Sequence, residues 1–347
     1  MTPSPTTVPD GPATTGAMAP EPDPPAILVE GLRRVYGDAV ALDGLDLTVA
    51  PGEVVGLLGP NGAGKTTCVD ILSTLVAPTG GRAVIAGHDL ATDPAGVRRS
   101  IALTGQFAAL DDQLTGRENL VLFARLLGRS RRVARRRAET LLAEFDLVDA
   151  ADRRVATYSG GMRRRIDIAA SLIGEPRVLF LDEPTTGLDP RSRAALWDTV
   201  RALRDRDIAV LLTTQYLEEA DALADRIVVI DHGRVVASGT ADELKSRVGV
   251  TVCTVVPQDP ARVPAAAGVL RALGPVPAPP PGATELSLPA PDGVATMRRA
   301  LRLLDDAGIP LADAGLRRPS LDDVFLALTG APASASTTAS TTAGGAG

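Results

Sequence analysis

Cysteine, lysine and aromatic residues are all scarce in this sequence of 347 residues. Its two cysteines, Cys68 and Cys253, are too few for a disulfide framework, which favours a reducing compartment. Aromatic residues make up 3% of the chain, so a core has to be built from leucine, valine, isoleucine and alanine. Lys65 and Lys245 are the only lysines among 36 lysine and arginine side chains, so each marks a position of interest.

Long apolar runs and a basic surplus are absent as well. No run reaches the roughly 18–20 apolar residues of a membrane-spanning helix, so any membrane role is expected to act through a partner. Residues 1–25 have neither a basic start nor an apolar stretch, and we expect a disordered tail there rather than a signal peptide. The net charge of −6 argues against general binding to nucleic acid, which usually requires a basic surplus.

What is present is a regular alternation of apolar runs with helical segments. Residues 26–37 and 39–49 are typical of two antiparallel strands, and 52–59 of a short buried strand that leads into a helix, Lys65–Val76. A mostly helical segment is expected from about 94 to 174. Three further apolar strands follow with helices between them, at 177–184, 208–215 and 225–231. This order predicts an α/β fold whose parallel sheet is covered on both faces.

The composition changes near residue 248, where we expect a small α+β appendage that extends to residue 330. Arg317–Gly330 is expected to close it with a helix whose apolar residues recur at helical spacing and face a core: Leu321, Val324, Phe325 and Leu328. Residues 331–347 are expected to form a second disordered tail. The basic run 128–145 is typical of a solvated helix face, the alternative being a surface for a partner or anionic lipid.

The stretch GPNGAGKTT, Gly59–Thr67, fits the phosphate-loop pattern G-x-x-x-x-G-K-[ST] between a strand and a helix. Glycines let backbone N–H groups approach phosphate oxygens, and the helix start adds positive potential. Lys65 would supply a compact charge to the β- and γ-phosphates, and Thr66 a hydroxyl for Mg²⁺. A plain glycine-rich turn is the alternative, which the strand–loop–helix context disfavours. The nucleotide-binding residues predicted here are Gly59, Asn61, Gly62, Ala63, Gly64, Lys65, Thr66 and Thr67.

The stretch RVLFLDEP places two acids, Asp182 and Glu183, at the carboxyl end of a buried strand. Ligand sites of open α/β sheets lie at that end. Asp182 can hold Mg²⁺, and Glu183 can act as a general base toward an attacking water. Such an ending is common by itself, but together with a phosphate loop it indicates hydrolysis of a nucleoside triphosphate.

A serine and two glycines open a further helix in YSGGMRRR, residues 158–165. This is a second helix start suited to an anion. One phosphate group seldom needs two such cradles from one subunit, so we expect this one to face the nucleotide of another subunit.

Five elements in order resemble the ATP-binding subunits of ABC transporters over roughly Ile27 to Leu244: the phosphate loop, Gln106 after a strand, SGG, LFLDEP and GLDP. The resemblance implies ATP and Mg²⁺, and an α/β P-loop domain at 26–247 with a mixed sheet, an antiparallel β subdomain and a helical subdomain. It also implies a separate integral-membrane permease and a second ATPase subunit, as a head-to-tail homodimer at the cytoplasmic face of the membrane.

The resemblance also implies individual roles. Tyr36 matches the aromatic residue that stacks on adenine, and Gln106 the residue that links Mg²⁺ and the catalytic water to the membrane subunit. Asp189 matches an acid that communicates between the two sites. The groups that close over the opposite subunit's γ-phosphate match Ser159, Gly160 and Gly161.

Gln215 stands where the family usually has a histidine that touches the γ-phosphate. Glutamine keeps a neutral donor and an acceptor, but it cannot become cationic or pass a proton. With Glu183 as base, we expect a slower or differently regulated site rather than a dead one. The predicted catalytic set is therefore Lys65, Gln106, Glu183 and Gln215.

Gln215 and the segment 317–330 both resemble the daunorubicin-resistance branch of ABC exporters, which implies export of a drug or antibiotic. One alternative is an exporter of polysaccharide, lipid or peptide, because no residue of this chain is expected to contact the cargo. Another is an ABC ATPase without a transport role, which the single cassette and the acidic balance disfavour.

Overall fold

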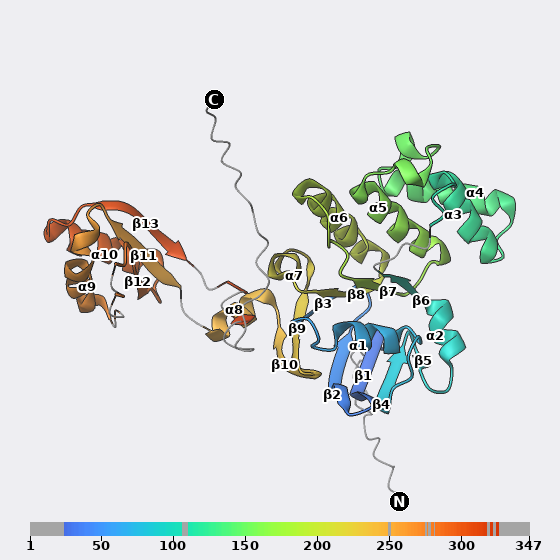
Figure 1. The fold of residues 1–347 in the computed structure, drawn as a ribbon, viewed down its shortest axis with the longest axis horizontal. Coiled ribbons are helices and arrows are strands. Elements are labelled where there is room, and N and C mark those ends of the chain that lie inside the picture. The colour runs from blue at the N-terminus through green and yellow to red at the C-terminus, as the bar shows by residue number, and fades with distance from the viewer. Residues whose placement is uncertain are drawn as a thin grey trace, which may run out of the picture.

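The computed structural model describes residues 24–105, 110–248, 251–274, 276, 279–280, 282–317, 320–321 and 324–325 (Figure 1). Within these residues, no helix has the length and apolar character that a membrane span requires. Gln106 and Leu328, both singled out above, lie outside the described residues.

A four-stranded antiparallel sheet opens the fold, in the order β2-β1-β4-β5. Its strands are β1 (Ile27–Tyr36), β2 (Ala39–Val49), β4 (Gly80–Ile85) and β5 (His88–Asp89). Apolar residues of β2 such as Leu45 and Leu47 are buried while their neighbours are exposed, so one face of this sheet packs inward. The predicted antiparallel pair at the start of the chain is confirmed.

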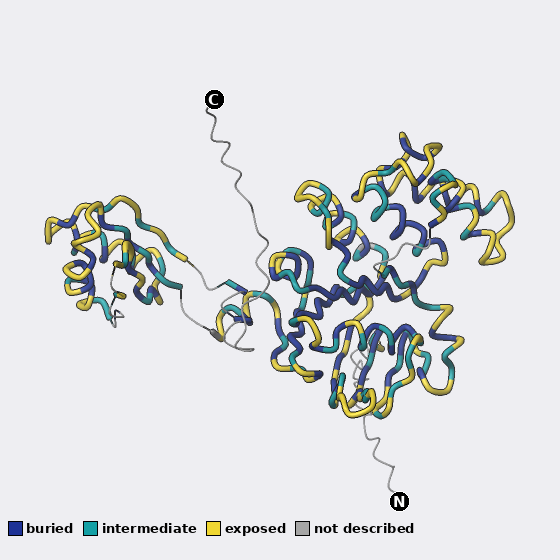
Figure 2. Tube along the Cα trace, in the orientation of Figure 1, coloured by how far each residue is buried: buried dark blue, intermediate teal, exposed yellow. Residues whose placement is uncertain are grey.

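A six-stranded sheet forms the centre, in the order β10-β9-β3-β8-β7-β6. Its strands are β3 (Val54–Leu58), β6 (Ile101–Thr104), β7 (Val178–Asp182), β8 (Ala209–Thr214), β9 (Arg226–Asp231) and β10 (Arg234–Gly239). All neighbours pair in parallel except β9 and β10. Every residue of β3, β7 and β8 is buried, as their continuous apolar sequences predict (Figure 2).

Two apolar clusters cover the faces of this central sheet. On one face, alternate residues of β3, β7 and β8 pack with helix α1 (Lys65–Leu72) and with the antiparallel sheet. On the other face they pack with helices α5 (Gly160–Ser171) and α6 (Pro190–Ala202). The predicted sheet with both faces covered is therefore confirmed.

Two expectations about helices can be compared with the structure: the mostly helical range from about 94 to 174, and the end of helix α1. The range expected to be mostly helical is so: it contains α2 (Pro94–Ser100), α3 (Gly116–Leu126), α4 (Arg131–Glu144) and α5. It also contains the strand β6. Helix α1 ends at Leu72, earlier than predicted, because Thr74 takes a left-handed backbone with φ of 67° and turns the chain.

The appendage holds a three-stranded antiparallel sheet with two helices, and it has an apolar core of its own. Its elements are β11 (Val252–Pro257), α9 (Val263–Leu270), β12 (Leu286–Pro289), α10 (Val294–Asp306) and β13 (Leu311–Arg317).

The segment after β13 corrects one expectation. Leu321, Val324 and Phe325 are buried as predicted, but they do not close the appendage. They join the cluster of α7 (Leu217–Leu223), β9, β10 and α8 (Ala241–Val248) on the main domain. The physical reason is that this cluster offers an apolar patch, and burying it is favourable by about 25 cal/mol per Å².

Candidate active site

Three adjacent strands bring the predicted site residues to one edge of the central sheet. Strand β8 lies between β3 and β7, with Thr214 opposite Leu58 of β3 and Thr213 opposite Asp182 of β7. The phosphate loop, Gln215 and the two acids therefore all emerge from the carboxyl ends of neighbouring parallel strands, where ligand sites form in such sheets.

The phosphate loop requires glycine at two positions. A Cβ at Gly59 would lie 2.5 Å from the carbonyl oxygen of Ile230. At Gly64, where φ is 105°, it would lie 2.6 Å from the carbonyl oxygen of Ala41, and helix α1 begins at the next residue. The loop backbone thus runs close to neighbouring strands and delivers its N–H groups to a helix N-terminus, which suits phosphate.

Other loop residues differ in accessibility. Ala63 is buried, Gly62 adopts a φ of 83°, and Thr67 is partly buried. Asn61 and Thr66 are exposed. The Thr66 hydroxyl is consequently accessible to a ligand at the mouth of the loop.

Lys65 is buried inside this loop, with 6% of its surface exposed. Its Nζ donates hydrogen bonds to the carbonyl oxygens of Gly59 at 2.7 Å and of Pro60 at 3.0 Å. Burial lowers the pKa of Lys65, and the nearby carboxylates of Glu183 and Asp182 offset part of that effect. The charges of both predicted acids therefore act on this cation, although no ion pair joins it to either of them within the described residues.

Asp182 and Glu183 are both held by Thr213, a residue whose importance the sequence did not reveal. The hydroxyl of Thr213 donates to Oδ1 of Asp182 at 2.5 Å. The N–H of Glu183 donates to the carbonyl oxygen and the hydroxyl of Thr213, both at 3.1 Å. This fully buried threonine thus fixes the positions of two adjacent acids.

Glu183 adopts a left-handed backbone conformation, with φ of 45°. Such a conformation costs about 1–3 kcal/mol for a non-glycine residue and persists only where the surroundings enforce it. Its carboxylate accepts a hydrogen bond from the Thr186 hydroxyl at 3.3 Å and is only partly buried. The strained residue stands directly after β7, at the edge of the sheet where the phosphate loop also begins.

The oxygen donors at this edge fit Mg²⁺. The Asp182 carboxylate and the Thr66 hydroxyl are hard oxygen ligands, and Mg²⁺ is usually held by one or two such protein groups together with substrate phosphates. In the described part of the chain, no group of three or more His, Cys, Asp or Glu side chains could hold a metal ion by itself. The few ligands present match that mode of binding.

Gln215 follows β8 directly and is partly buried. The hydroxyl of Thr214 accepts a hydrogen bond from the N–H of Tyr216 at 2.9 Å, which turns the chain into α7. Within the described residues, no hydrogen bond of the Gln215 side chain is found. Its place between the phosphate loop and Glu183 agrees with the predicted position of a phosphate-contacting residue.

The signature residues lie on a different helix. Ser159 caps the start of α5 by accepting a hydrogen bond from the N–H of Met162 at 3.3 Å, and both Ser159 and Gly160 are exposed. Within the described ranges, no hydrogen bond or ion pair joins residues 159–161 to the phosphate loop. The structure therefore does not bring these two anion-binding helix starts together in one chain.

Asp189 and the signature meet at Ser192. A Cβ at Gly161 would lie 2.5 Å from the Ser192 hydroxyl, so α5 and α6 pack tightly there. That hydroxyl donates to the Asp189 carboxylate at 2.6 Å, and this bond lowers the pKa of Asp189. Asp189 in turn caps α6 and is exposed.

Tyr36 ends β1 and keeps 43% of its surface exposed. The Arg34 guanidinium lies over its ring, 4.3 Å from the centroid. The ring is thus accessible for stacking.

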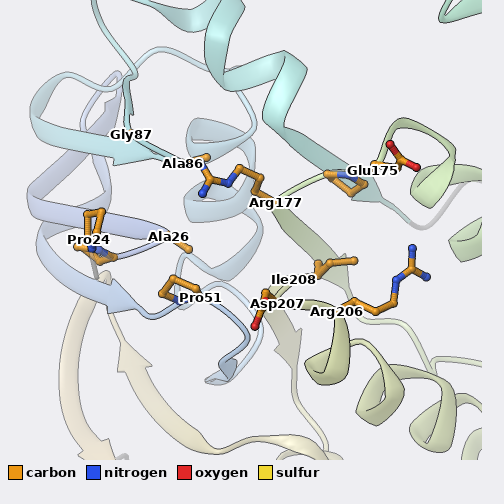
Figure 3. Close-up of a pocket in the computed structure, with 12 residues that line it drawn as sticks. Pro24, Ala26, Pro51, Ala86, Gly87, Glu175, Arg177, Arg206, Asp207 and Ile208 are labelled. Atoms are coloured by element: carbon orange, nitrogen blue, oxygen red, sulfur yellow. The ribbon is translucent and has the colours of Figure 1, made fainter. Parts of the chain in front are cut away.

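A separate hollow lies at the opposite edge of the sheet (Figure 3). It has a volume of about 550 Å³ and lies before the amino ends of β3, β7 and β8, with Pro51, Arg177 and Asp207 in its lining. Neither the phosphate loop nor the two acids line it, so it is not the site described here.

Comparisons with known proteins agree with this geometry. The family model described as ABC transporter matches residues 42–186. Doxorubicin resistance ATP-binding protein DrrA of Mycobacterium tuberculosis is 57% identical over 315 residues, which cover 89% of this chain and 95% of that protein. Daunorubicin/doxorubicin resistance ATP-binding protein DrrA of Streptomyces peucetius is 53% identical and covers 89% of this chain and 93% of that protein.

A solved structure described as an ATP-binding subunit of an ABC transporter is also similar. It is 33% identical with a TM-score of 0.57, and the match covers 64% of this chain and 92% of that chain. The resemblance inferred from the motifs is thereby confirmed, and this chain belongs to the ABC transporter family as one of its ATP-binding proteins.

Proposed function

We propose that this chain is the ATPase of a drug exporter, and that its ATP hydrolysis drives a separate integral-membrane permease. The observation that carries the proposal is the 53–57% identity, over almost nine tenths of the chain, to proteins named for doxorubicin and daunorubicin resistance. The cargo would accordingly be a drug or antibiotic such as doxorubicin or daunorubicin. The chain would act at the cytoplasmic face of the membrane, bound to its permease.

The geometry supports an in-line hydrolysis. The loop N–H groups and Lys65 would bind the β- and γ-phosphates, while Asp182 and Thr66 would hold Mg²⁺, which neutralises charge that develops on the phosphates. Glu183 would accept a proton from water as the water oxygen attacks the γ-phosphorus. The bond from that phosphorus to the bridging oxygen breaks, and ADP and inorganic phosphate leave.

A second copy of the chain would complete each site. Ser159 and Gly160 are exposed at a helix start, so they are free to approach a γ-phosphate bound by another subunit. Asp189, joined to the signature through Ser192, would pass changes at one site to the other. ATP would then favour the closed, head-to-tail dimer by its differential affinity for that state, and hydrolysis would reopen it.

Tyr36, Gln106 and Gln215 would complete the nucleotide contacts. Tyr36 has an exposed ring for adenine. Gln106 lies outside the described residues, and in the sequence it comes two residues after the end of β6, the strand that pairs with β7. Gln215 would donate its amide to the γ-phosphate, and Gln215→His tests whether glutamine slows the site, since an imidazole adds a cationic form.

The decisive test measures ATP turnover and drug uptake in inside-out vesicles that contain the chain and its permease. Lys65→Ala and Glu183→Gln should abolish most of both activities. Lys245→Ala is the matched control, because the only other lysine pairs with Asp221 on the surface at 2.7 Å. Unchanged turnover in Glu183→Gln would refute the hydrolytic mechanism, and turnover without uptake of daunorubicin would refute the cargo.

A further inference from the structure

Arg164 is a buried arginine on α5, four residues after Gly160, and only 13% of its side chain is exposed. Its Nε donates to the carbonyl oxygen of Pro184 at 3.0 Å, and its Nη1 donates to that of Gly105 at 2.8 Å. A longer contact of 3.5 Å joins Nη2 to the carbonyl oxygen of Asp182. One side chain from the signature helix therefore reaches the backbone after two strands of the central sheet.

These acceptors flank the residues to which catalysis has been assigned. Pro184 follows Glu183 directly, and Gly105 is the last described residue before Gln106. Strands β6 and β7 are hydrogen-bonded neighbours, so the two carbonyl groups lie at the same edge. The planar guanidinium, with donors in a fixed fork, is suited to hold two such groups at once.

The strained backbone of Glu183 is thus held from two sides. Thr213 of β8 accepts the N–H of Glu183, and Arg164 of α5 binds the carbonyl group of the next residue. A left-handed conformation persists only where its surroundings enforce it. Removal of the α5 support would free the peptide after Pro184, loosen the adjoining backbone of Glu183 and move the carboxylate.

Asp167 orients the guanidinium. Its Oδ2 lies 3.1 Å from Nη1 of Arg164, one helical turn along α5, and 10% of its side chain is exposed. Burial raises the pKa of Asp167 and lowers that of Arg164, and each charge offsets part of the effect on the other. Loss of one partner alone would leave an uncompensated buried charge.

We propose that Arg164 is a positioning residue that couples the signature helix to the catalytic carboxylate of Glu183, through the carbonyl groups of Pro184 and Gly105. The inference rests on the proposed function, because it needs Glu183 to act in hydrolysis. A rotation of α5, when its signature engages a nucleotide, would be transmitted through this side chain to the backbone at Gly105 and Pro184. The rival interpretation is a buried ion pair that only stabilises the fold.

Arg164→Lys separates the two interpretations. Lysine keeps the charge that Asp167 requires, but it lacks the fork that spans the carbonyl groups of Gly105 and Pro184. In full-length chain with its permease, we expect kcat to fall at least about tenfold, toward the roughly 100-fold loss that a displacement of 1 Å can cause. KM for ATP and the melting temperature should stay close to those of the parent.

The double variant Arg164→Met with Asp167→Asn removes both charges together and avoids an unpaired buried ion. It should show the same loss of kcat with ATP binding retained. Arg165→Met is the matched control: Arg165 is the next residue of α5, but it donates to the carbonyl oxygens of Phe145 and Asp146 in the helical region. Hydrogen exchange of residues 183–188 should quicken in both Arg164 variants and not in the control.

The outcomes are distinct. Parental kcat in Arg164→Lys and in the double variant would overturn the inference, as would an equal loss of kcat in Arg165→Met. Glu183→Gln is measured alongside them. If that variant keeps its turnover, the proposed function itself fails; if it loses turnover while the Arg164 variants keep theirs, only this inference fails.

Discussion

Replacement of Thr213 by valine removes one hydroxyl from the centre of the site and keeps the shape of the side chain. That hydroxyl donates to Asp182 and accepts from the N–H of Glu183. Thr213 is fully buried, so water cannot replace the lost donor freely. The carboxylate of Asp182 is left without this partner, and Glu183 keeps only the backbone bond to the carbonyl oxygen of residue 213.

The size of the effect follows from these contacts. A hydrogen bond to a charged group contributes about 1.5–3 kcal/mol to stability. For a domain of this size, each kcal/mol shifts the melting temperature by about 2–4 °C, which gives a fall of roughly 3–12 °C. If the loosened Glu183 loses about 1.4 kcal/mol of transition-state stabilisation, kcat falls about tenfold.

The assay combines thermal unfolding with ATP turnover over a range of Mg²⁺ concentrations. Thr104→Val is the matched control, since Thr104 is also buried near the same edge, at the end of β6, and its hydroxyl makes no hydrogen bond within the described residues. Thr213→Ser should restore both properties because it returns the hydroxyl. The reasoning is refuted if Thr213→Val melts within about 1 °C of the parent and hydrolyses ATP at the parental rate.

Two further predictions follow from buried titratable groups. Burial raises the pKa of Glu219, and nearby donors on Thr214, Thr185 and Trp197 offset only part of the rise. A raised pKa means that stability is lost as the pH rises above the ordinary value of 4.5, so Glu219→Gln should gain melting temperature relative to the parent between about pH 5 and pH 8. A difference in melting temperature between Glu219→Gln and the parent that stays constant from about pH 5 to pH 8 would contradict this prediction. Burial also raises the pKa of the Cys68 thiol from 9.0 to about 12. At about pH 8 the thiol of the folded protein should therefore react with Ellman's reagent about 1000-fold more slowly than the thiol of the unfolded protein, because only the thiolate reacts. Rapid labelling of the folded protein would contradict this prediction.

The central sheet could be predicted because β3, β7 and β8 are short, largely apolar runs that end in, or are followed by, glycine, acids or threonine. Runs such as 178–182 and 209–214 bury every residue, and parallel strands covered on both faces satisfy that requirement. Helix ends could not be predicted as well. The end of α1 depends on a left-handed Thr74, a conformation for which threonine gives no signal.

The C-terminal segment shows a second limit of sequence reasoning. The spacing of Leu321, Val324 and Phe325 predicts a buried face, and all three are buried. Periodicity does not say which apolar patch they cover. The choice between the appendage and the main domain depends on long-range packing, which placed them against Leu217 and Ile227.

Within the site, the sequence reveals the residues that could bind a ligand more readily than the residues that position them. Glycines and a lysine after one strand, together with two acids after another, form a pattern that is typical of nucleotide-binding sites. Thr213 has an ordinary β-strand residue type, and Arg164 lies in a run of three arginines that is typical of a solvated face. Their hydrogen bonds join segments far apart in sequence, so only the tertiary structure reveals them.

The hydrogen bonds of Thr213 also bear on the role of Gln215, which stands where the family usually has a histidine. Thr213 lies on β8, two residues before Gln215, and it is hydrogen-bonded to both acids. A phosphate contact at Gln215 that shifted the end of β8 would therefore move Asp182 and Glu183 through Thr213, whether the contact comes from an amide or an imidazole. Proton transfer is assigned to Glu183, so the contact needs only a donor. On this reasoning, turnover depends more on the strand end than on the residue that follows it, and Thr213→Val should lower kcat more than Gln215→Ala does.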